Sequence, residues 1–322
     1  MPFFKKLFIR IDGYGLDKLI LGNIRWYFLK ALTFLTKKNL YIFKIFDSKM
    51  YLDIFDIGLS KQLIKYRVRE MDHKILLDKI ARPNFNILDI GANIGYYALI
   101  ERSLIGDAGK LLLIEPSPEN VKLLKKNLEL NDISNAKVVE GAVSHANEKK
   151  NFHLSHESNL NTFHNYGSIK KHLSGEEIEV DTYTVPSLLS DTSFLDKLDL
   201  IRMDVEGHEV SVINGMLEQI ESNQLSPTII FETHISRYTE GNDMSHSLKR
   251  LFNAGYRVEY AASSWQEGTK LVNSLGYQPI QSVPTDGVRR SIYQNLKNED
   301  AINLICNLGG LRTVVLSKHN FD

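Results

Sequence analysis

The sequence predicts an α/β fold in which a mostly parallel sheet carries helices on both faces. Three observations predict it. From residue 85 onward, short apolar segments of strand length alternate with longer segments whose apolar residues recur at helical spacing. The apolar segments are typical of buried strands, and strands covered on both faces indicate a parallel sheet. The first of them runs directly into a glycine-rich turn and a helix, which is how a βαβ unit begins.

The expected elements follow this alternation along the chain. Strands are predicted, in order, at residues 86–90, 110–114, 136–142, 178–184, 198–203, 228–231 and 311–316. A helix is predicted over 94–104, and another begins where Ser117 caps a turn with Pro118 at its first position. Between the fifth and sixth strands, a further helix is predicted by apolar residues at helical spacing: Val210, Ile213, Leu217 and Ile220.

Composition narrows the class of protein. The chain has 322 residues, of which 43% are hydrophobic, enough to bury a sizeable core. Its formal net charge is zero, so we expect no nucleic-acid partner. Cys306 is the single cysteine and has no partner for an internal disulfide, which favours a reducing, cytoplasmic location. No secretory signal is recognisable at the N-terminus.

Residues 1–40 differ from the rest of the chain. They contain eight Lys and Arg against two Asp, interleaved with aromatic residues. Arg25 and Lys30 interrupt the apolar run that a membrane-spanning helix of about 20 residues would need. We favour a helical cap whose aromatic side chains pack on the following domain. The alternative is a peripheral helix on the inner face of an anionic membrane, or against a lipid-linked substrate. We expect a helical segment at 1–75 and the functional domain at 76–322.

The first strand ends in the run Asp89-Ile90-Gly91-Ala92-Asn93-Ile94-Gly95. Gly91 allows the turn, and Gly95 lets the next helix approach the strand. A dinucleotide site would place glycine at the position of Asn93, where the backbone must reach a pyrophosphate. S-adenosylmethionine has no phosphate, so a side chain is tolerated there. Asp89 is expected to accept a hydrogen bond from the ligand's ammonium, directly or through water.

Acidic and imidazole groups follow three further strands. Glu115 ends the second strand, where an acid can accept both ribose hydroxyls. Downstream, Asp204 and Glu206 project to one side of an extended strand end, as do Glu232 and His234. If these two strands are neighbours, they bring together five polar groups: Asp204, Glu206, His208, Glu232 and His234. Such groups are costly to bury unless they are paired, bound to a metal or used in catalysis.

At this point the chain resembles a known family. The words DIGANIGYYAL, LLLIEPSPEN, MDVEGHE and IIFETH, within about residues 50–260, resemble the FkbM methyltransferases. The resemblance implies a Rossmann-like class I methyltransferase with a seven-stranded sheet that uses S-adenosyl-L-methionine. Members are typically O-methyltransferases acting on natural products, sugars and glycans. The implied cofactor-binding positions are Glu70, Asp89, Gly91, Asn93, Gly95, Glu115, Asn120 and Ala142.

The resemblance leaves the chemistry of the acceptor side open. Asp204, Glu232, His234 and His208 are the candidate catalytic residues, and either His234 or a carboxylate could take the proton of an attacking hydroxyl. If a metal is present, Asp204, Glu232 and His234 would bind Mg²⁺ or Mn²⁺. The polar stretch 144–175, which holds five histidines, and the segment 263–290 are expected to lie over the site as loops or hairpins. Residues 1–40 and about 262–310 depart from the common pattern of the family.

We therefore expect an O-methyltransferase whose substrate is a hydroxyl-bearing small molecule, a glycan or a glycolipid. Two alternatives remain at the level of sequence. One is a nicotinamide-dependent oxidoreductase, against which Asn93 argues. The other is a non-catalytic cofactor-binding module, in which Asp204 and Glu232 only stabilise strand ends.

Overall fold

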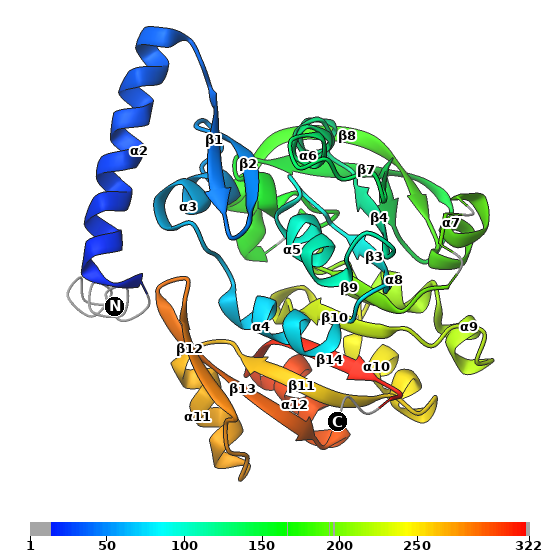
Figure 1. The fold of residues 1–322 in the computed structure, drawn as a ribbon. Helices are drawn as coiled ribbons and strands as arrows, with labels where there is room; N and C mark the ends of the chain where they lie inside the picture. Colours follow the sequence, from blue (N-terminus) through cyan, green and yellow to red (C-terminus); the bar gives the residue numbers. More distant parts are fainter. Residues whose placement is uncertain (1–13, 166, 193, 196, 320–322) are drawn as a thin grey trace.

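A nine-stranded sheet forms the centre of the molecule (Figure 1). The computed structural model describes residues 14–165, 167–192, 194–195 and 197–319. The strand order is β12-β13-β11-β14-β10-β9-β3-β4-β5. The strands are β3 (Asn86–Ile90), β4 (Lys110–Glu115), β5 (Ala136–Glu140), β9 (Leu200–Met203), β10 (Thr228–Glu232), β11 (Arg257–Ser263), β12 (Gln281–Thr285), β13 (Val288–Leu296) and β14 (Leu311–Ser317).

The sheet is parallel on one side and antiparallel on the other. Strands β5, β4, β3, β9 and β10 run parallel, as predicted. Strand β14 lies antiparallel between β10 and β11, and β13 and β12 extend the sheet as an antiparallel hairpin. The expected count of seven strands was too low. Strand β12 and the start of β13 lie in the segment 263–290, where a loop or hairpin was expected, and β11, which ends where that segment begins, was not predicted. Their apolar residues are fewer and more widely spaced than those of the buried parallel strands.

Helices cover both faces of the sheet, because successive side chains of each buried strand point to opposite sides. On β3, for example, Ile87 packs into one apolar core and Leu88 into the other. One face is covered by α4 (Met71–Ile80), α5 (Tyr96–Ile105) and α6 (Pro118–Glu129). The other is covered by α7 (Val185–Thr192), α8 (Glu209–Asn214), α9 (Leu217–Glu221), α10 (Met244–Asn253), α11 (Gln266–Ser274), α12 (Asn298–Asn303) and a π-helical turn, η4 (Leu304–Leu308).

The segment 1–75 was expected to be helical. Its described part contains a β-hairpin as well as helices. After α2 (Leu16–Thr36), strands β1 (Leu40–Ile45) and β2 (Ser48–Asp53) pair antiparallel, and α3 (Leu59–Tyr66) follows. Asn127 of α6 accepts a hydrogen bond from the backbone N–H of Tyr51 at 2.7 Å, and Leu52 is buried in the core beneath. The hairpin is therefore attached to the main domain. Residues 1–13, with several of the basic and aromatic residues noted above, lie outside the described residues.

A separate three-stranded sheet lies beside the main one. It contains β6 (Ala142–Val143), β7 (Glu148–Ser155) and β8 (Leu173–Tyr183) in the order β6-β8-β7. The predicted strand at 178–184 therefore belongs to this small sheet and not to the central one. The connection between β7 and β8 contains the short 3₁₀ turns η1 (Ser158–Leu160) and η2 (Gly167–His172). A further 3₁₀ turn, η3 (Ile235–Arg237), follows β10.

No helix among the described residues combines the length and the apolar character needed to cross a bilayer. The longest, α2, has 21 residues and stands at the edge of the molecule, against α3 (Figure 1).

Candidate active site

Two adjoining pockets lie at the carboxyl ends of β3, β4 and β9. The first, here called the Glu115 pocket, is lined by Ile90, Glu115, Ala142, Phe152, Phe163 and other residues. The second, here called the Glu70 pocket, is lined by Glu70, Arg69, Tyr96, Tyr97, Arg202 and other residues. The two share Gly91, Asn93, Asn159 and Asp204. The strand ends thus form one continuous site with two compartments.

The glycine loop has the geometry that its sequence demands. Gly91 has φ 82°, and a Cβ there would lie 2.3 Å from the carbonyl oxygen of Asp204. Gly95 has φ 92°, and a Cβ there would lie 2.8 Å from a side-chain carbon of Leu124 on α6. Both positions therefore exclude a side chain. Asn93 adopts φ 51°, a left-handed conformation that asparagine tolerates better than most residues.

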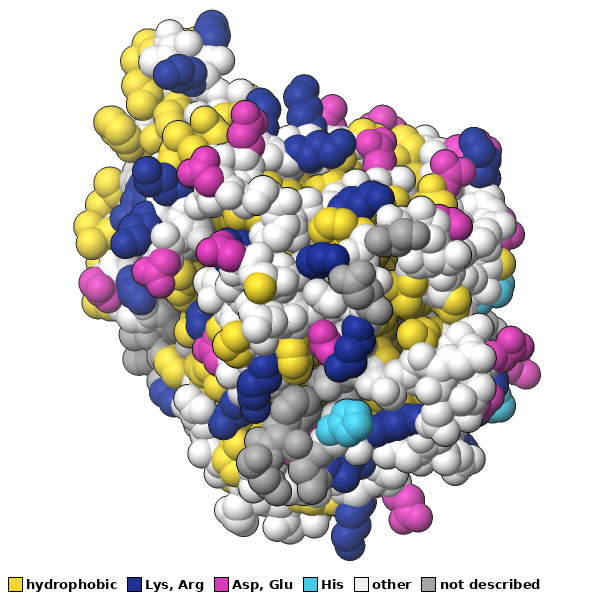
Figure 2. Space-filling model, turned by 45° about the vertical axis from the view of Figure 1, so that its right-hand side comes forward, with side chains coloured by type: hydrophobic (Ala, Val, Ile, Leu, Met, Phe, Trp, Pro, Cys, Tyr) yellow, Lys and Arg dark blue, Asp and Glu magenta, His cyan; other side chains and the backbone are white. Residues whose placement is uncertain are grey.

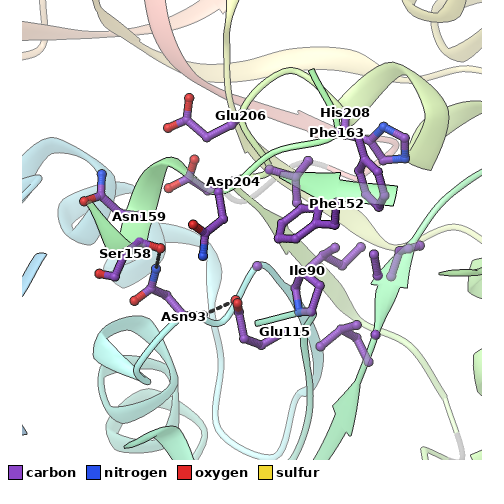
Figure 3. Close-up of a pocket in the computed structure, with 18 residues that line it drawn as sticks. Ile90, Asn93, Glu115, Phe152, Ser158, Asn159, Phe163, Asp204, Glu206 and His208 are labelled. Carbon is purple, nitrogen blue, oxygen red and sulfur yellow. Dashed lines mark hydrogen bonds between the residues drawn. The ribbon is translucent and has the colours of Figure 1, made fainter. Parts of the chain in front are cut away.

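Glu115 is the anchor of the first pocket (Figure 3). One carboxylate oxygen accepts the backbone N–H of Asn93 at 2.9 Å. The other accepts the backbone N–H of Ser117 at 3.0 Å and the side-chain amide of Asn120 at 3.1 Å. Burial raises the pKa of Glu115 to about 7, although these donated bonds act in the opposite direction. The carboxylate is held rigidly and retains lone pairs that can accept further hydroxyl groups.

Two residues expected to contact the cofactor directly do not line the Glu115 or the Glu70 pocket. Asp89 is fully buried, and its carboxylate accepts a bond from Arg202 at 3.0 Å. The expectation that Asp89 meets the ligand's ammonium is therefore wrong for this structure, because its side chain points into the core. Asn120 does not flank these pockets either. It bridges Glu115 and the carbonyl oxygen of Ser158, at 3.2 Å, and so supports the acid.

The side-chain amide of Asn93 is also already bonded within the protein. It donates to the carbonyl oxygen of Ser158 at 3.0 Å, while its oxygen accepts the backbone N–H of Ile94 at 2.8 Å. Figure 3 shows the first of these bonds joining the glycine loop to the β7–β8 connection. The polar stretch 144–175 therefore closes over the pocket, as expected, and Asn93 holds it there.

An acidic cluster surrounds His234 at the ends of β9 and β10, which are neighbours as the prediction required. The imidazole Nε2 lies 3.6 Å from Glu232, 3.6 Å from Glu206 and 3.9 Å from Asp204. The Nδ1 atom bonds Glu209 at 2.9 Å. Burial alone would lower the pKa of His234, but Glu209 and Glu206 more than offset it and hold that pKa well above its usual range. The surrounding carboxylates therefore favour the protonated form of the imidazole.

Arginine side chains compensate most of the remaining negative charge. Arg312 of β14 contacts Glu232 at 2.6 Å and Glu70 at 3.0 Å. Arg202 of β9 contacts Asp204 at 3.3 Å, in addition to Asp89. The pKa of Glu70 is held well below its usual range, since Arg69 and Arg312 outweigh the effect of burial.

His208 lies apart from this cluster. It lines the Glu115 pocket, its Nε2 lies 3.1 Å from the hydroxyl of Ser144, and its ring centre lies 4.4 Å from that of Phe163. Burial lowers the pKa of His208 to about 3, so the ring is neutral. His208 shares the Glu115 pocket with Asp204 and Glu206, but it bonds Ser144 and does not join the cluster around His234. The expected convergence of five groups therefore holds for Asp204, Glu206, Glu232 and His234 and not for His208.

Several residues that build the site have no clear signal in the sequence. Glu209 is the first residue of α8, where an acid is common at a helix start, yet it is fully buried against His234. Arg312 lies in a strand read only as apolar. Phe152 and Phe163 are the aromatic side chains of the Glu115 pocket. Their only sign in the sequence is that they are apolar residues within the polar stretch 144–175.

The sheet order, the glycine loop and the strand-end acid define a Rossmann-like class I methyltransferase domain with the α/β fold that the sequence predicted. The chain belongs to the FkbM methyltransferases: the model of the methyltransferase FkbM domain matches residues 89–258. It is therefore an S-adenosylmethionine-dependent methyltransferase. This finding rules out the nicotinamide-dependent alternative.

Individual relatives are distant. The 2-O-methyltransferase NoeI of Sinorhizobium fredii is 30% identical over 177 residues, which cover 52% of this chain and 70% of the relative. Methyltransferase 1 of Beauveria bassiana is 24% identical over 193 residues, covering 56% and 75%. The crystal structure of methyltransferase FkbM from Methylobacillus flagellatus aligns with a TM-score of 0.37 and 16% identity, covering 88% of this chain and 61% of that one.

Proposed function

We propose that this protein transfers a methyl group from S-adenosylmethionine to a hydroxyl of a sugar, a glycan or a small natural product. The observation that carries the proposal is the position of Asp204, which lines both the Glu115 pocket and the Glu70 pocket and belongs to the acidic cluster. A proton acceptor is thus adjacent to the expected cofactor site. The name of the relative NoeI, a 2-O-methyltransferase, supports oxygen as the acceptor atom.

The two compartments suit the two halves of the cofactor. We assign the ribose hydroxyls to the carboxylate of Glu115, and the adenine to the apolar surface formed by Ala142 and Phe152. The methionine half is assigned to the Glu70 pocket, where Arg69 can meet a carboxylate and Glu70 an ammonium. Gly91 would separate the two halves, since it lines both compartments and leaves no side chain in the way.

The bound cofactor would supply a methyl group on a positively charged sulfur, already a good leaving group. The protein's own contribution is then to hold the acceptor oxygen in line and to take its proton. We assign proton acceptance to the carboxylate of Asp204. His234 bonds Glu209 through Nδ1 and lies beside Asp204 and Glu206 through Nε2, and these carboxylates favour its protonated form. We therefore assign it, with Glu209 behind it, the role of positioning Asp204 and Glu206.

A divalent cation is the second possibility for this cluster. Asp204, Glu232 and His234 offer ligand atoms within 4.8 Å of one another, and their chemistry suits Mg²⁺ or Mn²⁺. However, Arg312 is 2.6 Å from Glu232, and Arg202 is 3.3 Å from Asp204. These guanidinium groups already provide the positive charge that a metal would bring. We therefore propose turnover without a metal.

The substitution Asp204→Asn tests the proposed role of Asp204. The amide keeps the size of the side chain but cannot take a proton, so kcat should fall by roughly 10²–10⁴-fold. The affinity for S-adenosylhomocysteine, measured by calorimetry, should change by less than about threefold, since binding does not need this proton acceptor. Turnover is followed as S-adenosylhomocysteine release on a panel of sugars and hydroxylated small molecules.

The matched control is Asp78→Asn on α4, a carboxylate that contacts only Lys74 at the surface. It should leave turnover unchanged. If Asp204→Asn methylates an acceptor as fast as the unmodified protein, Asp204 is not the proton acceptor. If the unmodified protein binds S-adenosylhomocysteine but methylates no hydroxylated acceptor in the panel, the proposed transfer to a hydroxyl oxygen is contradicted.

The predicted division into residues 1–75 and 76–322 remains a proposal. Glu70 and Arg69 come from the first part and Asp204 from the second, and the Glu70 pocket needs both. We expect the chain beginning at residue 76 to bind S-adenosylhomocysteine more weakly than the full chain, as calorimetry would measure.

A further inference from the structure

Helix α2 is apolar on two opposite faces. One face packs on the rest of the molecule through the buried side chains of Leu19, Trp26 and Leu29. The opposite face carries large apolar side chains that are at least half exposed: Leu16, Ile20, Leu21, Ile24, Tyr27, Phe28, Phe34 and Leu35. A helix that is apolar all round is normally buried on every side, and a continuous exposed apolar surface marks an interaction site.

This finding corrects the favoured interpretation of the N-terminal segment. A cap was expected to pack its aromatic side chains on the domain. Of the aromatic residues in α2, only Trp26 does so, whereas Tyr27, Phe28 and Phe34 are 69%, 65% and 76% exposed. Figure 2 shows apolar side chains gathered at the upper left edge of the molecule, where α2 lies, with basic side chains beside them. Among the described residues, none covers this face.

Lysine side chains border the exposed face. Lys18, Lys30, Lys37 and Lys38 are all exposed, and Asp17 is the one acidic residue between positions 14 and 38. Arg25 has a different task, since it donates to the carbonyl oxygens of Ile64 and Lys65 and so attaches α2 to α3. The apolar face is therefore bordered by lysine side chains. Lys30 and Lys37 also lie over the rings of Trp26 and Phe34, at 5.4 and 4.9 Å from the ring centres, and none of the four lysines forms a salt bridge with a carboxylate within the described residues.

We infer that α2 docks on the surface of an anionic lipid membrane, with its axis parallel to the surface. Exposed leucine, isoleucine and phenylalanine side chains would enter the boundary between headgroups and acyl chains, and the lysines would reach the phosphates. The 21-residue helix would extend about 31 Å along the surface.

Charge complementarity favours lipid over a second copy of this chain. Two α2 helices packed face to face would bring their lysine rims together, with only Asp17 from each copy to compensate them. Like charges at such a rim oppose association. An anionic lipid surface supplies the missing negative charge along the whole length of the helix. This inference does not depend on the identity of the methyl acceptor.

Vesicle flotation with the full-length protein tests the inference. The unmodified protein should float with vesicles of phosphatidylcholine and phosphatidylglycerol, and much less with phosphatidylcholine alone. The double substitution Phe28→Ser with Leu35→Ser should weaken the partition at least about tenfold, because two exposed apolar side chains are lost. Lys18→Gln with Lys38→Gln should weaken it by roughly fivefold per lysine on anionic vesicles only. Added salt should act in the same direction.

The control removes two exposed apolar side chains elsewhere on the surface, Leu275→Ser with Ile280→Ser, each of which is 42% exposed. It should float like the unmodified protein. Calorimetric binding of S-adenosylhomocysteine verifies that every variant is folded. Absence of flotation with the unmodified protein would overturn the inference. So would a dimer in sedimentation without lipid that the Phe28→Ser and Leu35→Ser pair converts to a monomer, because the apolar face would then belong to a second copy.

Discussion

Replacing Asp89 by alanine should destabilise the protein far more than it affects contacts with the cofactor. Asp89 and the guanidinium of Arg202 are 3.0 Å apart, and their side chains are 0% and 3% exposed. Removing one partner of such a buried pair costs about 3–5 kcal/mol of the free energy of unfolding. Since Asp204 and the carbonyl oxygen of Gly91 still accept from Arg202, we expect the lower end, about 3 kcal/mol. For a chain of this length, that corresponds to a fall in Tm of about 4–5 °C.

The assay is thermal unfolding, compared with calorimetric binding of S-adenosylhomocysteine well below the lowest Tm. Asp89→Asn keeps an acceptor for Arg202 and should lose less than Asp89→Ala. The control Asp78→Ala breaks an exposed pair with Lys74 and should change the free energy of unfolding by less than about 0.5 kcal/mol. If Asp89→Ala unfolds at the original Tm but loses cofactor affinity, the reasoning from burial fails and the direct contact expected from the sequence is restored.

Three further predictions follow from the site. Glu115→Gln should weaken S-adenosylhomocysteine binding by about 1.5–3 kcal/mol, and only the unmodified protein should lose affinity as the pH falls through about 7. Calorimetry that finds the same affinity and the same pH dependence in both proteins would show that Glu115 is remote from the ribose. His208 stays neutral in the folded protein down to about pH 3, whereas the same residue in the unfolded chain binds a proton below about pH 6.5. The contribution of His208 to the free energy of unfolding is therefore fully present above about pH 6.5 and is lost on acidification. Between about pH 7.5 and about pH 5, the free energy of unfolding of His208→Gln should fall by about 2 kcal/mol less than that of the unmodified protein. Denaturant titrations that show the same fall in both proteins would contradict this. Turnover should persist in EDTA. If EDTA abolishes activity and Mg²⁺ or Mn²⁺ restores it, a metal site at Asp204, Glu232 and His234 would be supported instead.

The sequence predicted the parallel half of the sheet because its strands are short, apolar and separated by helices of regular spacing. It also predicted that Glu115 would face a ligand and that Asp204 and Glu232 would end neighbouring strands, since both follow from where strands stop. The antiparallel extension, β11 to β13, was missed because these strands mix polar and apolar residues. Their pairing partners lie far apart in the chain.

The errors within the site have a common physical cause. Position at a strand end does not say which way a side chain points. Asp89 lies within β3, in register with Arg202 of β9, and its side chain faces the core and that arginine. Asp204 lies just past the end of β9, two positions further along in register, and lines both pockets. Arg312, 242 residues from its partner Glu70, could be linked to that carboxylate only through the folded sheet.

The position of β14 has a consequence for synthesis on the ribosome. This strand, Leu311–Ser317, pairs with β10 on one side and with β11 on the other, although both are made earlier. Roughly fifty residues separate the end of β11 from the start of β14, which at typical elongation rates is about 2–10 s during which both edges stand unpaired. In that interval Glu70 and Glu232 also lack Arg312. Until residues 311–317 are made, the nascent chain would therefore hold two unpaired strand edges in the middle of the sheet, a state prone to aggregation.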